Sequence, residues 1–216
     1  MLYFDIETVK GDGAYVESVI EEIRNNTKPP ANIKKQETID KWYQEKHDIE
    51  VNKKIDKLAL DGATNKIVSI AYAIDDSEIK AIYGEDEKAI LNDFAAMLKE
   101  NLIMNICGHN IINFDLKVLK QRYMINQINV VRSFSTHFDA KPWNAAVFDT
   151  MHRWDTNNFI SMDKLCRIFG LDGKGDTTGA DVAEMYAKGK LDDIAEYNKH
   201  DVELVREIHK RMRVVY

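Results

Sequence analysis

Short apolar stretches rich in β-branched and aromatic residues alternate with amphipathic segments along most of this 216-residue chain. The stretches that predict strands are residues 1–6, 66–74, 79–83, 102–107 and 145–148. The segments that predict helices are residues 16–23, 87–100, 113–123, 162–169, 180–187 and 191–212. Residues 79–83 are the expected hairpin partner of residues 66–74. This order predicts an α/β domain with one mixed central sheet flanked by helices.

Three short motifs carry four acidic residues at the ends of these predicted elements or, in one case, inside a helix. Asp5 and Glu7 close the first strand, and because they are two positions apart, both carboxylates point to the same face of that strand. Asp115 ends the motif Gly108-His109-Asn110-Ile111-Ile112-Asn113-Phe114-Asp115, early in a helix. Asp201 lies inside the last predicted helix. Residues on neighbouring elements can lie close together in space although they are far apart in the sequence.

Carboxylates that meet in this way repel one another strongly unless cations lie between them. The repulsion is on the order of 4 kcal/mol for each pair at 4 Å with an effective dielectric constant of 20, and it raises carboxylate pKa values in the metal-free protein. Mg²⁺ and Mn²⁺ prefer oxygen ligands. Two such ions held together support in-line attack on a phosphodiester. We therefore predict that Asp5, Glu7, Asp115 and Asp201 hold two divalent ions, Mg²⁺ or Mn²⁺.

Tyr197 precedes Asp201 by four residues on the last predicted helix. Residues at this spacing project from one helix face. The phenol can therefore lie beside an attacking water while Asp201 holds a metal ion. His200 points about 100° away around the helix, so we assign it no catalytic role. Tyr197 joins the four acids as the fifth predicted catalytic residue.

Taken in this order, the motifs resemble those of the DEDD superfamily of DnaQ-like 3′-5′ exonucleases. Tyr197 is typical of the branch that has Tyr before the last Asp, since Glu196 stands where the other branch has His. Ser161–Cys166 and Gly179–Val182 are similar to stand-alone bacterial and phage exonucleases related to the proofreading domain of family B polymerases. The resemblance implies a ribonuclease H-like fold. It also implies metal-dependent removal of nucleotides from the 3′ end of DNA, with single-stranded ends as the expected substrate.

The resemblance further implies which side chains contact the substrate. Asn110 is expected near the substrate strand with His109 beside it, and Phe114 is expected beside the terminal bases. Thr8, which follows Glu7, and Lys164 complete this predicted set. The alternatives are that His109 satisfies a buried backbone group and that Phe114 belongs to the core.

Other polar residues allow a structural or a functional interpretation. Asp149, in Phe148-Asp149-Thr150, is either a fifth acid at the rim of the site or the cap of a turn or helix. Arg167 and Lys174 are further candidates for phosphate contacts. Cys107 and Cys166 lie far apart without a Cys-x-x-Cys motif, which predicts two core residues.

Residues 25–60 differ in composition from the segments around them. Pro29-Pro30 opens this stretch, which carries a dense mixture of Lys, Glu and Asp with weak helical spacing. We interpret it as a charged helical insertion in a single domain of residues 1–216. Mixed-sign charge favours a solvated helical hairpin. The alternative is a substrate-facing lid in which Trp42 and Tyr43 stack on bases.

The net charge of −6 argues against a protein that coats nucleic acid tightly. Bound cations would offset this charge at the site itself. DNA 3′ ends are the expected partner, and a replication polymerase acting in trans is another. RNA 3′-end trimming and a catalytically inactive nucleic-acid-binding module are the alternative functions. The chain lacks an apolar run of about 20 residues and a signal-peptide pattern, which predicts no membrane contact and a cytoplasmic location.

Overall fold

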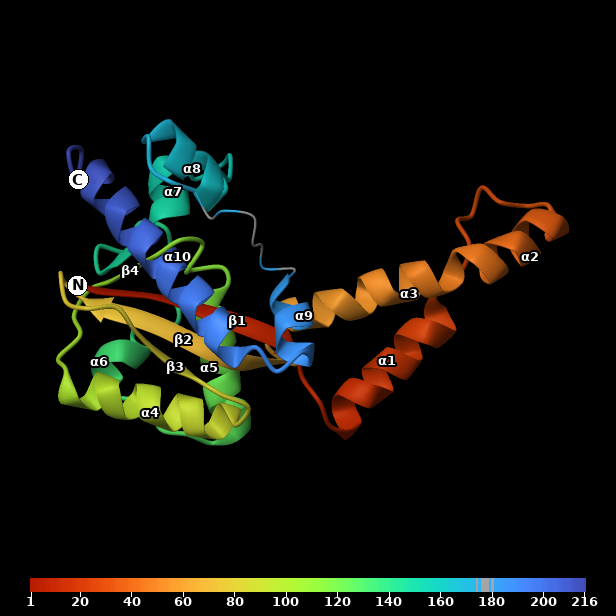
Figure 1. Cartoon of the computed structure of the whole chain (residues 1–216), viewed down its shortest axis with the longest axis horizontal. Helices are drawn as coiled ribbons and strands as arrows, with labels where there is room; N and C mark the ends of the chain where they lie inside the picture. The colour runs from red at the N-terminus through yellow and green to blue at the C-terminus, as the bar shows by residue number, and fades with distance from the viewer. Residues whose placement is uncertain (174, 176–178, 180) are drawn as a thin grey trace. The chain divides into compact units, whose positions relative to one another are not determined.

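The computed structural model describes residues 1–173, 175, 179 and 181–216 (Figure 1). These residues form two compact units. We call Met1–Thr8 together with Ile67–Tyr216 the sheet unit, and Val9–Lys66 the helical unit. None of the helices that the described residues form is both long and apolar enough to cross a membrane.

A five-stranded sheet in the order β3-β2-β1-β4-β5 lies at the centre of the sheet unit. Its strands are β1 (Leu2–Lys10), β2 (Asn65–Ile74), β3 (Lys80–Tyr83), β4 (Ile106–Gly108) and β5 (Val147–Asp149). Strand β4 pairs in parallel with β1 and β5, and β3 pairs antiparallel with β2. The mixed sheet and the hairpin are therefore confirmed. Residues 102–105 were expected in the fourth strand, but Leu102 and Met104 are exposed and β4 begins only at Ile106.

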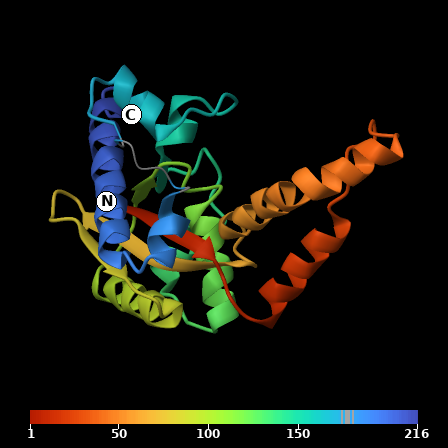
Figure 2. The same cartoon turned by 45° about the vertical axis from the view of Figure 1, so that its right-hand side comes forward.

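Helices cover both faces of this sheet. They are α4 (Glu87–Glu100), α5 (Asp115–Asn126), α6 (Arg132–Ser135), α7 (Thr150–Trp154), α8 (Met162–Ile168), α9 (Asp181–Ala187) and α10 (Leu191–Met212). Figures 1 and 2 show α10 along one face, with α4 and α5 on the other. Helices α6 and α7 were not expected from the sequence, because helices this short hold too few turns to show a helical period.

The alternation of β1 determines which of its side chains reach each helical layer. Leu2, Phe4 and Ile6 belong to the apolar core that also contains residues of α4 and α5. Tyr3 packs in the second core, which contains the buried face of α10. Because successive strand residues alternate between faces, Asp5 and Glu7 project on the same side as Tyr3, toward the layer that contains α10. Both predicted core cysteines are buried in the described structure, as expected.

The helical unit consists of α1 (Ala14–Asn26), α2 (Gln36–Glu45), α3 (His47–Asp56) and the 3₁₀ helix η1 (Lys57–Leu60). Trp42 is 6% exposed and packs edge-on against the rings of Tyr43 and His47. The burial of Trp42 disagrees with the alternative in which it stacks on bases, whereas Tyr43 is 47% exposed. The description of one domain with an insertion at about residues 25–60 stays a prediction.

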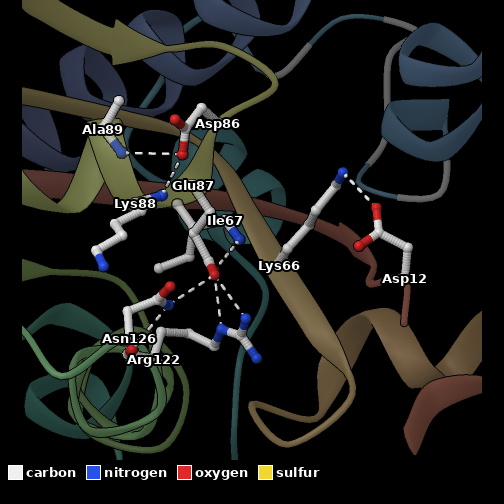
Figure 3. A network of polar contacts seen from close by, with 9 residues as sticks. All are labelled: Asp12, Lys66, Ile67, Asp86, Glu87, Lys88, Ala89, Arg122 and Asn126. Carbon is white, nitrogen blue, oxygen red and sulfur yellow. Dashed lines mark hydrogen bonds and ion pairs between the residues drawn. The ribbon is translucent and has the colours of Figure 1, made fainter. Parts of the chain in front are cut away.

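A buried ion pair joins three elements of the sheet unit (Figure 3). The Oε1 atom of Glu87 accepts hydrogen bonds from the backbone N–H of Ile67 and from Nε of Arg122, each at 2.8 Å. Asn126 donates to the other carboxylate oxygen at 2.9 Å. The side chains of Glu87 and Arg122 are only 9% and 12% exposed. The carboxylate thus ties the first turn of α4 to β2 and α5.

Glu87→Ala is expected to lower the free energy of unfolding by about 3–5 kcal/mol, because it leaves the buried Arg122 charge without its carboxylate. Chemical denaturation measures this change. The matched control is Glu184→Ala, which removes an exposed carboxylate paired with Lys188 on the surface and should change stability by less than about 1 kcal/mol. Equal losses in the two variants would contradict a structural role for the buried network.

Candidate active site

Three carboxylates from two elements meet on the α10 side of the sheet. Asp5 and Glu7 on β1 and Asp201 on α10 each offer an oxygen, and these oxygens lie within 4.8 Å of one another. Asp201 is 1% exposed and Glu7 is 9% exposed. Strand alternation directs Asp5 and Glu7 to this face, and α10, which packs there, carries Asp201. Residues from opposite ends of the sequence therefore lie close together.

Asp115 lies beside this group, at the first position of α5. Its Oδ1 atom accepts a hydrogen bond of 3.1 Å from the backbone N–H of Ile6, the residue between Asp5 and Glu7. A negative side chain in the first turn also suits the positive end of the helix. The group of three close oxygens does not include Asp115, so among the described residues it adjoins the cluster through the β1 backbone.

The surroundings of Asp115 disfavour its charged form. Burial raises the pKa of this carboxyl group well above its usual range, and the negative charge of Asp5 raises it further. Hydrogen bonds from its own backbone N–H and that of Ile6 act in the opposite direction but are smaller effects. The raised pKa agrees with the expectation for a metal-free cluster, but desolvation contributes more than repulsion does.

The donor set fits a hard divalent cation. All the side chains that meet are carboxylates, and oxygen is the ligand that Mg²⁺ and Mn²⁺ prefer. A cation there would offset the negative charge of Asp5, which raises the pKa of Asp115.

The conformation of the loop before Asp115 depends on Gly108 and Asn110. A Cβ atom on Gly108 would lie only 2.6 Å from the Ile111 side chain, so a larger residue here would have to displace Ile111. Asn110 adopts a left-handed conformation with φ of 60°, which asparagine tolerates better than most residues. The loop therefore folds back over the end of β4 before α5 begins.

Asp149 holds this loop in place. Its carboxylate accepts hydrogen bonds from the backbone N–H groups of Asn110 at 3.0 Å and Ile112 at 3.1 Å. The same carboxylate caps α7 through the N–H groups of Met151 and His152. Asp149 is 1% exposed. The capping interpretation is confirmed. Among the described residues, Asp149 does not join the three carboxylates that meet, although its negative charge also raises the pKa of Asp115.

Four of the predicted substrate-contacting residues lie next to the predicted ligands in the chain or in the loop that leads to Asp115. His109 is half-buried, and its Nδ1 atom lies 2.9 Å from Oγ1 of Thr150. The side-chain oxygen of Asn110 accepts a hydrogen bond of 3.2 Å from Asn113. Phe114 is half-buried against the α5 core, and Thr8 is 8% exposed next to Glu7. Their roles toward a substrate stay predictions.

The predicted phosphate-binding cations lie on α8 or outside the described residues. Lys164 is exposed in the first turn of α8. Arg167 forms an ion pair of 2.7 Å with Asp163 on the same helix. Lys174 lies outside the described residues, as does Ala180 of the Gly179–Val182 motif.

Helix α10 carries the predicted Tyr197 one turn before Asp201, and Tyr197 is 8% exposed. It also carries Asn198, which was not expected at the site. Asn198 is fully buried, and its Nδ2 atom donates a hydrogen bond of 2.7 Å to Oδ2 of Asp5. The signal that could have found it is its position three residues before Asp201, on the same side of the helix.

A family model described as "Predicted 3'-5' exonuclease related to the exonuclease domain of PolB" matches residues 60–212. The chain belongs to this family. Asp115, Tyr197 and Asp201 lie within the matched part of this PolB-related exonuclease, whereas Asp5 and Glu7 precede it. Membership indicates a 3′-5′ exonuclease and hence a nucleic-acid substrate. None of the curated proteins compared with the chain matched it.

A solved structure similar to this PolB-related exonuclease is the family B DNA polymerase from the hyperthermophilic archaeon Pyrobaculum calidifontis. The two superpose with a TM-score of 0.60 at 16% sequence identity. The similarity covers 98% of this chain but only 24% of the polymerase chain. At this identity the likeness shows the fold alone, and it confirms the expected ribonuclease H-like architecture with its mixed sheet.

Proposed function

We propose that this protein is a metal-dependent 3′-5′ exonuclease that releases nucleotides from single-stranded DNA ends. Family membership supports the exonuclease activity and its polarity. The observation that carries the metal dependence is the meeting of Asp5, Glu7 and Asp201. Carboxylates this close to one another repel, so a site of this kind is stable in its charged form only with cations.

Asp5, Glu7 and Asp201 would hold the cations, with Asp115 as the fourth ligand beside them. Divalent ions bound at such a site neutralise phosphate charge and make a water molecule more acidic. On the basis of these four acids and Tyr197, we assign the enzyme to the Tyr branch of the DEDD superfamily. Either Mg²⁺ or Mn²⁺ suits the carboxylate oxygens.

The remaining side chains position the reactants. Tyr197 projects from the same face of α10 as Asp201, so its phenol can orient the attacking water. Asn110 and His109 are presented by the loop that Asp149 anchors, and Phe114 follows them at the start of α5. Thr8 adjoins Glu7 on β1, and Lys164 contributes a positive charge from α8. We assign the side chains other than Tyr197 to contacts with the 3′-terminal nucleotides; they are Thr8, His109, Asn110, Phe114 and Lys164.

Digestion of end-labelled oligonucleotides tests this proposal. We expect single nucleotides to be released from the 3′ end of single-stranded DNA in Mg²⁺ or Mn²⁺, with no release in the presence of chelator. Matched single-stranded DNA, duplex DNA and RNA are compared in parallel. Faster digestion of RNA would replace the DNA assignment with RNA 3′-end trimming. Binding of DNA without release of nucleotides would identify an inactive module.

Tyr197→Phe is expected to lower kcat by about 10- to 100-fold, because a water that is no longer oriented reacts less often. This loss should be smaller than that from removing a predicted metal ligand. Tyr15→Phe, which removes a hydroxyl from a residue that is 61% exposed on α1, is the control and should leave kcat unchanged. A loss in Tyr197→Phe as large as that in Asp201→Ala would assign the phenol a larger part than orienting water.

A further inference from the structure

A buried amide on α10 is hydrogen-bonded at both of its ends. The Nδ2 atom of Asn198 donates to Oδ2 of Asp5, and Oδ1 of Asn198 accepts from the hydroxyl of Ser69 on β2; both distances are 2.7 Å. Asn198 and Ser69 are each fully buried. The three side chains therefore form a chain of hydrogen bonds from β2 through α10 to β1.

The groups around Asn198 determine which end of its amide faces Asp5. An ionised carboxylate only accepts hydrogen bonds, so the amide must present its NH₂ group to Asp5. The amide oxygen then faces Ser69, whose hydroxyl can donate to it. A rotated amide would place its oxygen against the Asp5 carboxylate, with two acceptors in contact. Ser69 thus holds the amide in the orientation that Asp5 requires.

We propose that Asn198, held by Ser69, is a positioning residue that fixes the Asp5 carboxylate for cation binding. This inference rests on the proposed metal-dependent function. A neutral donor suits such a task, because it orients the carboxylate without bringing a positive charge that would compete with the cation. The hydrogen bond occupies one acceptor position of Asp5, and a carboxylate has about four.

The location of Asn198 on α10 adds a second effect. Asn198 and Asp201 are three residues apart on the same helix, so they share one side of it. The hydrogen bond from Asn198 to β1 therefore also sets the spacing between Asp5 on the strand and Asp201 on the helix. Loss of the amide should loosen the whole carboxylate group as well as the orientation of Asp5.

Calorimetric titration of Mn²⁺ and Mg²⁺ into the intact protein tests this inference without relying on activity. Asn198→Leu, which keeps the branched shape of the side chain but removes its donor and its acceptor, should weaken cation binding by about 10- to 100-fold. The increase in Tm on adding cation should shrink in parallel. Glu203→Gln replaces an exposed side chain on the same helix and is the matched control, with unchanged cation affinity.

Ser69→Ala is the milder variant, and it keeps the experiment decisive even if Asn198→Leu does not fold. It should weaken cation binding by a smaller factor, about 3- to 10-fold. In the double variant, Ser69→Ala should add nothing to the effect of Asn198→Leu, because Ser69 acts only through the amide. In kinetic assays, kcat at fixed cation should fall while KM for DNA stays within about twofold, and excess Mn²⁺ should restore part of kcat.

The outcomes separate this inference from the proposed function. If the wild-type protein binds no divalent cation, both are wrong. If the wild-type protein binds cations and Asn198→Leu or Ser69→Ala binds them equally well, only the positioning role is overturned. Fully additive effects of Ser69→Ala and Asn198→Leu would also overturn it, because they would show that the two side chains act independently.

Discussion

Asp5→Ala or Asp201→Ala is expected to abolish nucleotide release, with a loss in kcat on the order of a thousandfold or more. Each variant removes one of the carboxylates whose oxygens lie within 4.8 Å of one another, and the remaining pair cannot hold cations in the same geometry. The fold should survive, because each deletion also removes repulsion from the cluster.

Release of labelled nucleotides at saturating Mg²⁺ measures this loss, and circular dichroism verifies the fold. Asp48→Ala is the matched control: the Asp48 side chain is 94% exposed on α3, and the variant should digest DNA at the wild-type rate. Undiminished activity in either cluster variant, with the fold intact, would refute the assignment of the site.

Asp115→Asn should separate activity from stability. We expect the activity to fall by a factor similar to that in Asp201→Ala, whereas the metal-free protein should become more stable by about 1–2 kcal/mol. Asparagine can still accept the hydrogen bond from Ile6, but it avoids the desolvation and the repulsion by Asp5 that disfavour the carboxylate.

The pH dependence of this gain has a definite sign. The pKa of Asp115 is raised in the folded protein, so its protonated form stabilises the fold at low pH. That stability is lost as the pH rises through the raised pKa. The advantage of Asp115→Asn should therefore grow as the pH increases from the acid range.

Thermal unfolding in chelator, repeated across pH values, measures the gain. Saturating Mn²⁺ should raise the Tm of the wild-type protein more than that of Asp115→Asn, because cation binding stabilises only the folded form that binds it. A lower metal-free stability for Asp115→Asn would contradict the unfavourable burial of the Asp115 charge. An equal response of both proteins to Mn²⁺ would contradict the role of Asp115 as a ligand.

Local periodicity accounts for much of what the sequence could predict about the fold. The β2–β3 hairpin, α4 and α10 were expected close to their observed bounds, because strand and helix periods depend on neighbours a few residues away. Residues 102–105 were expected in a strand because Leu102, Ile103 and Met104 form an apolar run, but such runs also occur in exposed segments.

In the candidate site, too, local periodicity predicts some features and the packing of elements decides others. Strand alternation by itself places Asp5 and Glu7 on one face, and helical spacing places Tyr197 with Asp201. Neither period says which face of the sheet α10 covers. That depended on the packing of Tyr3 and its neighbours against α10 in the second apolar core.

By itself, the sequence determined the types and order of the elements, the acidic residues, and the family resemblance that connects them. Only the tertiary structure decided that Asp149 anchors a loop, that Trp42 is buried, and that Asn198 reaches Asp5. The hydrogen bonds from Ile6 to Asp115 and from Asn198 to Asp5 span 109 and 193 residues. Contacts over such distances arise from the packing of whole elements, which no local pattern encodes.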